Sequence, residues 1–361
     1  MPKKAQAFVK PGLSMRHVLC VWWKVVILVS LFICILAFLR IQQYSQSTVS
    51  PYSTALPRKS RVFGDQFRGN PKIAFLFLVR RNLPLDFVWE SFFENVDKAN
   101  FSIYVHSEPG FVFDESSTRS AFFFNRQLRN SIKVAWGEAS MIEAERLLFE
   151  EALQDPANQR FVLLSDSCVP LYNFSFSYNY LMVSPRSFVD SFLDKKDVRY
   201  HPKMSPVIPK KKWRKGSQRR PPVDASKGKM NTKLQKQHNC IPDEHYVQTL
   251  LAMNDLESEL ERRTVTYTLW SQSGKNTENE AWHPFTFSYA DSGPQQIKRI
   301  KDINHVYYET EFRTEWCSNN STSVPCFLFA RKFSQGAAMR LLSQGVVGNF
   351  DISALMEKPP P

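Results

Sequence analysis

The sequence predicts an α/β fold, a parallel sheet covered by helices, that follows an N-terminal membrane-spanning helix. Ile73–Val79 is a continuous apolar run of strand length, which is typical of a strand buried on both faces. Helix-like and strand-like segments alternate after this run. Before it, Val18–Leu39 is apolar and carries a single charge, Lys24, near its start.

The segment after the first strand has a helical period. Its apolar side chains recur every three to four residues from Leu85 to Val96, which predicts a helix with Pro84 and Asp86 in its first turn. Phe101–His106 is then predicted to be a second buried strand. A strand, a helix and a strand in this order are expected of parallel pairing.

A second such unit is predicted farther along the chain. Ile132–Trp136 and Phe161–Ser165 have the pattern of strands. Between them, Ser140 and Glu143 form a capping box that opens a helix ending near Leu153. The order strand, helix, strand, strand, helix, strand is that of an α/β sheet with helices on its faces.

Polar residues follow the predicted strands. They are His106-Ser107-Glu108, Trp136-Gly137-Glu138 and Ser165-Asp166-Ser167. In open α/β sheets, ligands bind beyond the carboxyl ends of the strands. We therefore expect a ligand site where these three segments meet.

Basic residues before the apolar span orient it. Lys3, Lys4, Lys10 and Arg16 precede the span and Arg40 follows it, so the positive-inside rule places the N-terminus in the cytosol. A cleavable signal peptide is the alternative, but its apolar core would be shorter and would end in small residues. A signal anchor is therefore the favoured interpretation.

The chain is accordingly predicted to have four parts. Residues between the anchor and the first strand are rich in Ser, Gln and Pro and lack a sustained apolar period, as in a stem. The parts are a cytosolic tail of residues 1–17, a transmembrane signal anchor of residues 18–40, a luminal stem of residues 41–70 and a folded domain of residues 71–361.

The net charge of +13 is concentrated in two short stretches. Residues 1–24 hold five basic residues and no acid, and residues 203–238 hold twelve basic residues against Asp224 alone. The rest of the chain is slightly acidic. A uniformly basic nucleic-acid-binding protein is therefore not expected.

Acceptor tripeptides for N-glycosylation are compatible with a luminal address. They include Asn100, Asn173, Asn319 and Asn320. Such tripeptides also arise by chance in a chain of this size, so each is only a candidate for glycosylation.

The cysteines beyond the anchor form an even set, as in an oxidising compartment. They are Cys168, Cys240, Cys317 and Cys326, and four cysteines allow three pairings. Only a Cys317–Cys326 loop is suggested by proximity. Buried free thiols are the alternative.

Motifs that bind phosphate or metal by themselves are missing. The sequence contains no GxxxxGK[ST], no strand-linked GxGxxG, no HExxH and no CxxC. Asp166 stands between two serines and lacks the paired carboxylates that hold a divalent metal beside a diphosphate. Basic side chains would neutralise such a diphosphate, and Arg331-Lys332 follows the apolar run Phe327–Ala330 at a predicted strand end. An exposed strand terminus is the alternative for this pair.

Two further segments have both a structural and a functional interpretation. Pro242 followed by Asp243 and Glu244 is an ordinary helix start, or it holds a carboxylate, Glu244, that accepts a proton from a hydroxyl. Gly216 and Ser217 lie in a basic stretch that is either a solvated loop or a glycan or phosphate site.

Several motifs taken in order closely resemble the plant core-2/I-branching β-1,6-N-acetylglucosaminyltransferase-like proteins. The resemblance spans residues 72–333 and includes KIAFLFLVRRNLPLDFVWESFF, FSIYVHSEP, WGEASMIEAERLL, RFVLLSDSCVPLYNF, WRKGSQ, CIPDEHYVQTLL and CFLFARKF. It implies a type II Golgi membrane protein with a GT-A-like, Rossmann-type nucleotide-sugar-binding domain. It further implies a metal-independent, inverting transfer from a UDP-sugar, with no cofactor.

The resemblance also assigns roles to individual residues. Glu244 matches the general base, Lys332 the basic residue that contacts the departing diphosphate, and Arg331 its neighbour. Nucleotide binding is implied for His106, Gly137, Ser140 and Asp166. Gly216 and Ser217 match a segment that lines the donor or acceptor side.

The sequence departs from the family pattern after Gln218. The family continues with an aromatic residue and a long helix, whereas here Gln218 is followed directly by Arg219-Arg220-Pro221-Pro222. Loss of a core helix would expose its apolar partners and would displace Glu244.

Three functions are therefore compared. The first is a Golgi glycosyltransferase that transfers a sugar, N-acetylglucosamine by family, from a UDP-sugar to a glycan or glycoprotein while anchored in the bilayer by residues 18–40. The second is a catalytically silent, membrane-anchored glycan-binding or scaffold protein, which the missing helix favours. The third, a nucleic-acid binder built on residues 203–238, would require cytosolic or nuclear exposure, and we expect no nucleic-acid partner.

Overall fold

A computed structural model describes most of the chain from Phe67 onward, together with four residues nearer the N-terminus. The chain divides into two units, residues 1–66 and 67–361, and every element below belongs to the second. The described residues are 24, 27, 30, 31, 67, 69–194, 200–216, 241–270, 284–319 and 322–347.

The predicted membrane anchor, residues 18–40, lies almost entirely outside the described residues. Within the described ones, no helix has the length and apolar character needed to cross a membrane. Most of the predicted stem, residues 41–70, is likewise outside them. The anchor and the stem stay predictions.

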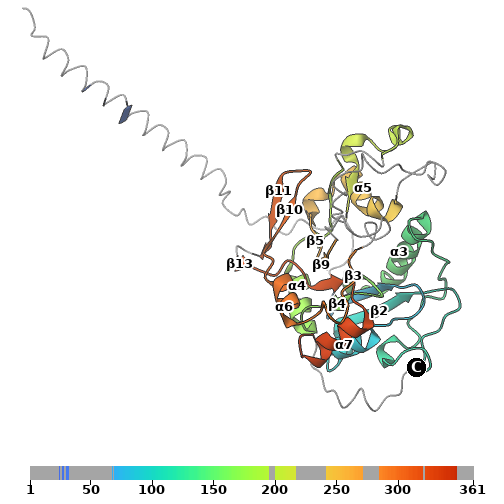
Figure 1. Cartoon of the computed structure of the whole chain (residues 1–361). Helices are drawn as coiled ribbons and strands as arrows, with labels where there is room; N and C mark the ends of the chain where they lie inside the picture. The colour runs from blue at the N-terminus through green and yellow to red at the C-terminus, as the bar shows by residue number, and fades with distance from the viewer. Residues whose placement is uncertain are drawn as a thin grey trace, which may run out of the picture. The chain divides into compact units, whose positions relative to one another are not determined.

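The centre of the fold is a three-stranded parallel sheet with the order β2-β1-β3 (Figure 1). Leu78, the last residue of β1, lies opposite His106 in β2 and Ser165 in β3. The sheet confirms the α/β fold and all three of these predicted strands. Their bounds are β1 Lys72–Leu78, β2 Phe101–His106 and β3 Asn158–Ser165.

A second, mixed sheet has the order β4-β14-β9. Its middle strand, β14, is antiparallel to β4 and parallel to β9. Because β4 follows β3 after a short turn, this sheet continues from the end of the first one. The bounds are β4 Val169–Pro170, β9 Thr266–Thr268 and β14 Phe329–Arg331.

Six helices and several two-stranded ribbons complete the described part of this unit. The helices are α2 Asp86–Phe93, α3 Ala139–Ala152, α4 Phe174–Val183, α5 Tyr246–Met253, α6 Pro294–Lys301 and α7 Gln335–Ser343. The paired strands are β5 Ser187–Phe188 with β8 Leu260–Glu261, β6 Phe192–Leu193 with β7 Arg214–Lys215, β10 His305–Tyr308 with β11 Arg313–Trp316, and β12 Ser318–Asn319 with β13 Thr322–Ser323.

Both faces of the central sheet are covered. On one face, Phe75 of β1 packs edge-on against Phe92 and Phe93 of α2, with ring centroids 5.7 and 5.1 Å apart. On the other face, Leu76 packs in a cluster with Leu148 of α3. This double burial is the reason why β1 is apolar at every position from Ile73 to Leu78.

The prediction of a strand at Ile132–Trp136 is wrong. These residues have no strand partner, and the backbone N–H of Ile132 donates to Nε2 of His106 at 3.1 Å. The edge of β2 that faces away from β1 is already occupied, because Val105 exchanges backbone hydrogen bonds with Arg126 and Leu128. A fourth parallel strand therefore has no position beside β2.

The predicted capping box is also wrong, although its helix is present. Helix α3 begins at Ala139, with Glu138 at the N-cap. The Ser140 hydroxyl instead accepts from the backbone N–H of Ala135 at 3.0 Å, and Glu143 pairs with Arg146. The serine is therefore used to close the loop before the helix.

The cysteine prediction is confirmed in part. Cys317 and Cys326 form a disulfide that closes a short loop. Cys168 is a buried free thiol, which is the alternative that the sequence left open. Cys240 lies outside the described residues.

Trp89 of α2 connects the two sheets, since its ring lies 5.1 Å from Phe77 of β1 and 6.1 Å from Phe329 of β14. We expect Trp89→Ala to lower the free energy of unfolding by about 3–5 kcal/mol, because it leaves a cavity in a fully buried position. Thermal or urea unfolding measures this change. Leu153→Ala, at an exposed position, is the control, and equal effects of both variants would contradict the packing described.

Candidate active site

The carboxyl ends of the parallel strands form one edge, as predicted. Because Leu78 lies opposite both His106 and Ser165, the residues that follow the three strands start at the same level. Arg80, two residues beyond β1, pairs there with Asp166, with 3.4 Å between Nε and Oδ2. The edge therefore combines side chains that are distant in sequence.

The second sheet brings Arg331 and Lys332 to the same edge. The strand β14 ends at Arg331, and the backbone N–H of Phe333 donates to the carbonyl of Ser167 at 3.0 Å. Ser167 directly follows Asp166, so the two cations lie beside the turn that carries this carboxylate. The predicted placement of the pair at a strand end is confirmed.

This edge carries an excess of positive charge. The pKa of Lys332 is lowered by burial and by the neighbouring cations Arg331 and Arg80, whereas Asp166 opposes the shift. The buried Nε of Arg331 has no hydrogen-bond partner among the described residues. This excess of cations over the single carboxylate of Asp166 suits an anionic ligand. No cluster of three or more His, Cys, Asp or Glu side chains in the described part is arranged to hold a metal ion.

His106 supports the edge from within. It is buried, and its Nε2 accepts a hydrogen bond from the N–H of Ile132. Burial lowers the pKa of His106, so the ring is neutral near pH 7. His106 thereby holds the loop that precedes α3. The nucleotide contact predicted for His106 stays a prediction.

Gly137 and Ser140 shape this same loop. Gly137 has φ +73°, a left-handed conformation that favours glycine, and no atom within 4 Å of an added Cβ. Ser140 closes the loop through Ala135, as described above. The two residues thus form the start of α3, and α3 in turn contacts the segment Pro242–Glu244.

Glu244 is held by its own backbone. Pro242–Glu244 is a single 3-10 turn, with the proline at its first position as predicted. The carbonyl of Glu244 accepts from the N–H of Gly216 at 2.8 Å, and Nδ1 of His245 donates to the carbonyl of Arg214 at 2.8 Å. These bonds connect the turn to β7 and hold the backbone of Glu244 in place.

Gly216 is required by close packing. A Cβ at this position would lie 2.9 Å from the backbone carbonyl of Asp190 and would also collide with the Gln248 side chain. The absence of a side chain therefore lets β7 approach both neighbours. Ser217, its predicted partner, lies outside the described residues.

Ion pairs anchor the strand that holds Glu244. Arg214 of β7 binds Glu257 through two hydrogen bonds, of 2.7 and 2.9 Å. Arg262 lies 3.7 Å from Glu257 and donates to Glu311 at 2.7 Å. This partly buried network extends to Arg313 of the β10–β11 ribbon and limits the motion of β7.

Three carboxyl groups gather where α3 meets the Glu244 turn. Burial and, to a smaller extent, the charge of Asp243 raise the pKa of Glu145 in α3 to about 7. In the same turn, Oε2 of Glu244 lies 3.8 Å from Nζ of Lys215. This region thus carries carboxyl groups that can exchange protons, whereas the strand-end edge of the sheet carries an excess of cations.

The glycosylation candidates lie on different elements. Asn173 is exposed at the N-cap of α4, where its Oδ1 accepts from the N–H of Phe176 at 3.0 Å. Asn100 is half-buried at the end of a 3-10 turn before β2. Asn319 is in β12, and Asn320 lies outside the described residues. Their modification stays a prediction.

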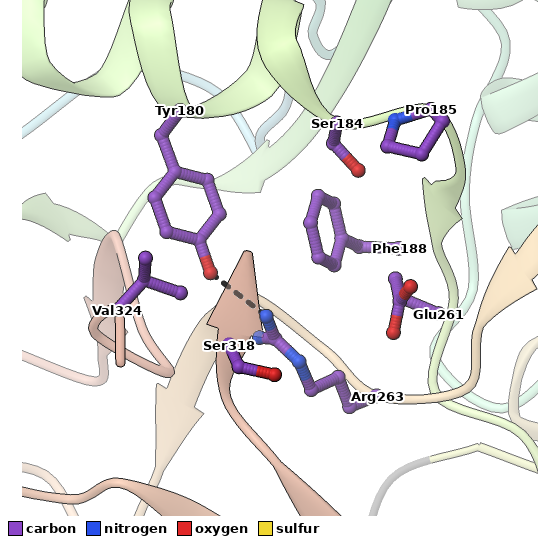
Figure 2. Close-up of a pocket in the computed structure, with 8 residues that line it drawn as sticks. All are labelled: Tyr180, Ser184, Pro185, Phe188, Glu261, Arg263, Ser318 and Val324. Atoms are coloured by element: carbon purple, nitrogen blue, oxygen red, sulfur yellow. Dashed lines mark hydrogen bonds between the residues drawn. The ribbon is translucent and has the colours of Figure 1, made fainter. Parts of the chain in front are cut away.

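A small cavity lies away from these groups (Figure 2). Inside it, the buried guanidinium of Arg263 donates to the hydroxyl of Tyr180 at 2.7 Å and to the carbonyl of Cys326 at 2.8 Å. Arg263 also covers the ring of Phe188. These contacts join α4 to the disulfide loop, and none of the predicted site residues lines the cavity.

Comparison with known proteins assigns the class. The family described as Core-2/I-Branching enzyme matches residues 73–301, and the chain belongs to this family. It is therefore a glycosyltransferase. It is similar to "Glycosyltransferase BC10" of Oryza sativa subsp. japonica, with 50% identity over 310 residues that cover 77% of this chain and 78% of that protein. The predicted family is confirmed.

Three charged residues of the site, Arg80, Glu145 and Lys215, were not predicted as site residues from the sequence. Arg80 follows the first strand, so the rule that ligands bind at strand ends could have found it. Glu145 and Lys215 are placed by contacts between α3, β7 and the Glu244 turn. Such contacts leave no local sequence signal.

We expect Gly216→Ala to destabilise the protein by about 1–3 kcal/mol and to displace Glu244, because the Asp190 carbonyl is backbone and cannot rotate away. Thermal unfolding and turnover measure the two effects. Gly336→Ala in α7 is the control, since its Cβ would only make an ordinary 3.7 Å contact with Tyr289. Wild-type stability of Gly216→Ala would contradict the packing.

Glu145 makes stability depend on pH. Its folded pKa of about 7 lies above the ordinary glutamate value of 4.5, so its contribution to stability is present at low pH and is lost as pH rises from about 4.5 to 7. We expect Glu145→Gln to match the wild type near pH 4.5 and to be more stable by about 1–2 kcal/mol at pH 8. Unfolding curves across this range decide it, with exposed Glu143→Gln as control. A constant difference at every pH would refute the assignment.

Proposed function

We propose that this glycosyltransferase transfers N-acetylglucosamine from a UDP-sugar to a hydroxyl of a glycan or glycoprotein, with inversion and without a metal ion. The observation that carries the proposal is the group of cations at the strand ends, where Arg80 and Lys332 lie by Asp166 and Arg331 lies by Lys332. Developing negative charge on a departing diphosphate is stabilised by cations placed in advance. The sugar is an inference from the family, whose matched name concerns core-2/I-branching enzymes.

In the proposed reaction, Glu244 accepts the proton of the acceptor hydroxyl. The hydroxyl oxygen then forms a bond to the anomeric carbon, and the bond from that carbon to the diphosphate oxygen breaks. The electron pair leaves with UDP, beside Lys332, Arg331 and Arg80. Support for Glu244 comes from its turn, which is fixed by Gly216 and His245 while its carboxylate faces Lys215.

We further propose that the protein is a type II Golgi membrane protein with residues 71–361 in the lumen. The proposal rests on the apolar span Val18–Leu39 and the basic residues before it. The Cys317–Cys326 disulfide is compatible with an oxidising lumen. UDP-sugar, acceptor and bilayer are then its partners.

A specific observation favours a second candidate, a catalytically silent glycan-binding or scaffold protein. Helix α5 exposes Tyr246, Val247 and Leu250 on one face, while the smaller Thr249 and Ala252 are buried. Exposed apolar side chains at this position are what the loss of a packing helix after Gln218 would leave.

Turnover of UDP-sugars by the purified full chain in detergent tests the first candidate. In EDTA, we expect UDP release from UDP-N-acetylglucosamine to fall at least about 100-fold in Glu244→Gln, because the amide cannot accept the proton. Exposed Glu259→Gln should retain wild-type activity. Activity that survives in Glu244→Gln would exclude this residue as the base.

Lys332→Met separates the leaving-group role from the base. We expect a drop of about 10-fold or more in kcat, since one cation is removed from the departing diphosphate. Release that requires added metal would contradict the metal-independent proposal. A folded wild-type chain with no turnover of any UDP-sugar would favour the silent candidate.

A further inference from the structure

Lys215 forms a little-exposed charge pair with Glu244. Its Nζ lies 3.8 Å from Oε2 of Glu244, and the two side chains are only 14% and 12% exposed. This distance exceeds a hydrogen bond, so the interaction is Coulombic. A charge pair with so little water around it is screened much less than an exposed one.

The backbone determines this arrangement. Lys215 lies opposite Phe192 in the β6–β7 ribbon, between Arg214, which is bound by Glu257, and Gly216, which binds the Glu244 carbonyl. Successive side chains of a strand point to opposite sides. With Arg214 directed to Glu257, Lys215 is directed to the other side, where Glu244 lies.

Within the described part of the chain, two further carboxyl groups lie near the Glu244 turn. Helix α3 contributes Glu145, and the turn itself contributes Asp243. The residue after the turn is His245, whose Nδ1 is bonded to a backbone carbonyl. Like charges in close proximity disfavour ionisation, and a cation offsets this effect.

We propose that Lys215 is a positioning residue whose ammonium orients the Glu244 carboxylate and stabilises its charge, ready to accept the proton of the acceptor hydroxyl. The inference rests on the proposed function, in which Glu244 is the base. The proton moves from the hydroxyl to Glu244, the new bond forms at the anomeric carbon, and the electron pair leaves with the diphosphate. Lys215 neither gains nor loses a proton.

The pH dependence of kcat in the full chain tests this role. In Lys215→Met, which removes the charge and keeps most of the length of the side chain, we expect the acid limb of the profile to move up by about one pH unit. On the acid side of that limb kcat then falls about 10-fold, whereas KM for UDP-N-acetylglucosamine stays within about twofold. Lys215→Arg, which keeps the charge, restores the wild-type profile.

The matched control is Lys298→Met, which breaks an exposed Lys298–Asp302 pair in α6 and should leave the profile unchanged. Equal loss of kcat at every pH in Lys215→Met, or an unchanged profile, would overturn the proposal. Full activity of Glu244→Gln would instead refute the base assignment of the proposed function. The two failures are therefore distinguishable.

A second measurement applies even to a chain without turnover. In a double-mutant cycle of Lys215→Met and Glu244→Gln, we expect a favourable coupling of about 2 °C in melting temperature at pH 7. The coupling should vanish near pH 3, where the carboxylate is protonated. Coupling that behaves in this way supports the ion pair, and its absence at pH 7 overturns it.

Discussion

The parallel pairing of β1 with both β2 and β3 is the constraint on which the rest of the structure depends. It aligns Leu78 with His106 and Ser165, so the polar residues after all three strands meet at one edge. The pairing requires β1 to be buried on both faces, and the aromatic side chains of α2 and the aliphatic ones of α3 provide this burial. The cations that gather around Asp166 are a consequence of this register and of the second sheet.

The candidate site has two parts with different physical requirements. The strand-end part needs positive charge, and Arg331 and Lys332 reach it because β14 pairs with the strand that follows β3. The other part needs a carboxylate in a defined place; Gly216 holds the Glu244 backbone through one hydrogen bond, and the carboxylate lies near Lys215. Helix α3 is common to both, since its N-terminal loop is bound by His106 and its body contacts the Glu244 turn.

Much of the fold was predictable because periodicity reports burial. The three parallel strands, α2 and α3 were found from apolar patterns, and the Cys317–Cys326 pair from proximity. The strand expected at Ile132–Trp136 failed, since Ile132 bonds a histidine ring and the neighbouring edge is already occupied. The capping box failed for a similar reason, because Ser140 bonds a backbone group in the preceding loop. Local patterns do not contain such competition between partners.

The sequence by itself determined the α/β class, the family and the identity of Glu244 and Lys332 as candidates, because each is written in contiguous motifs. Only the tertiary structure decided that Arg80 joins Lys332 by Asp166, and that Lys215 and Glu145 both lie near the Glu244 turn. The physical reason is that electrostatic interactions depend on distance and burial. Residues far apart in the chain come close together and become buried only when the strands and helices pack.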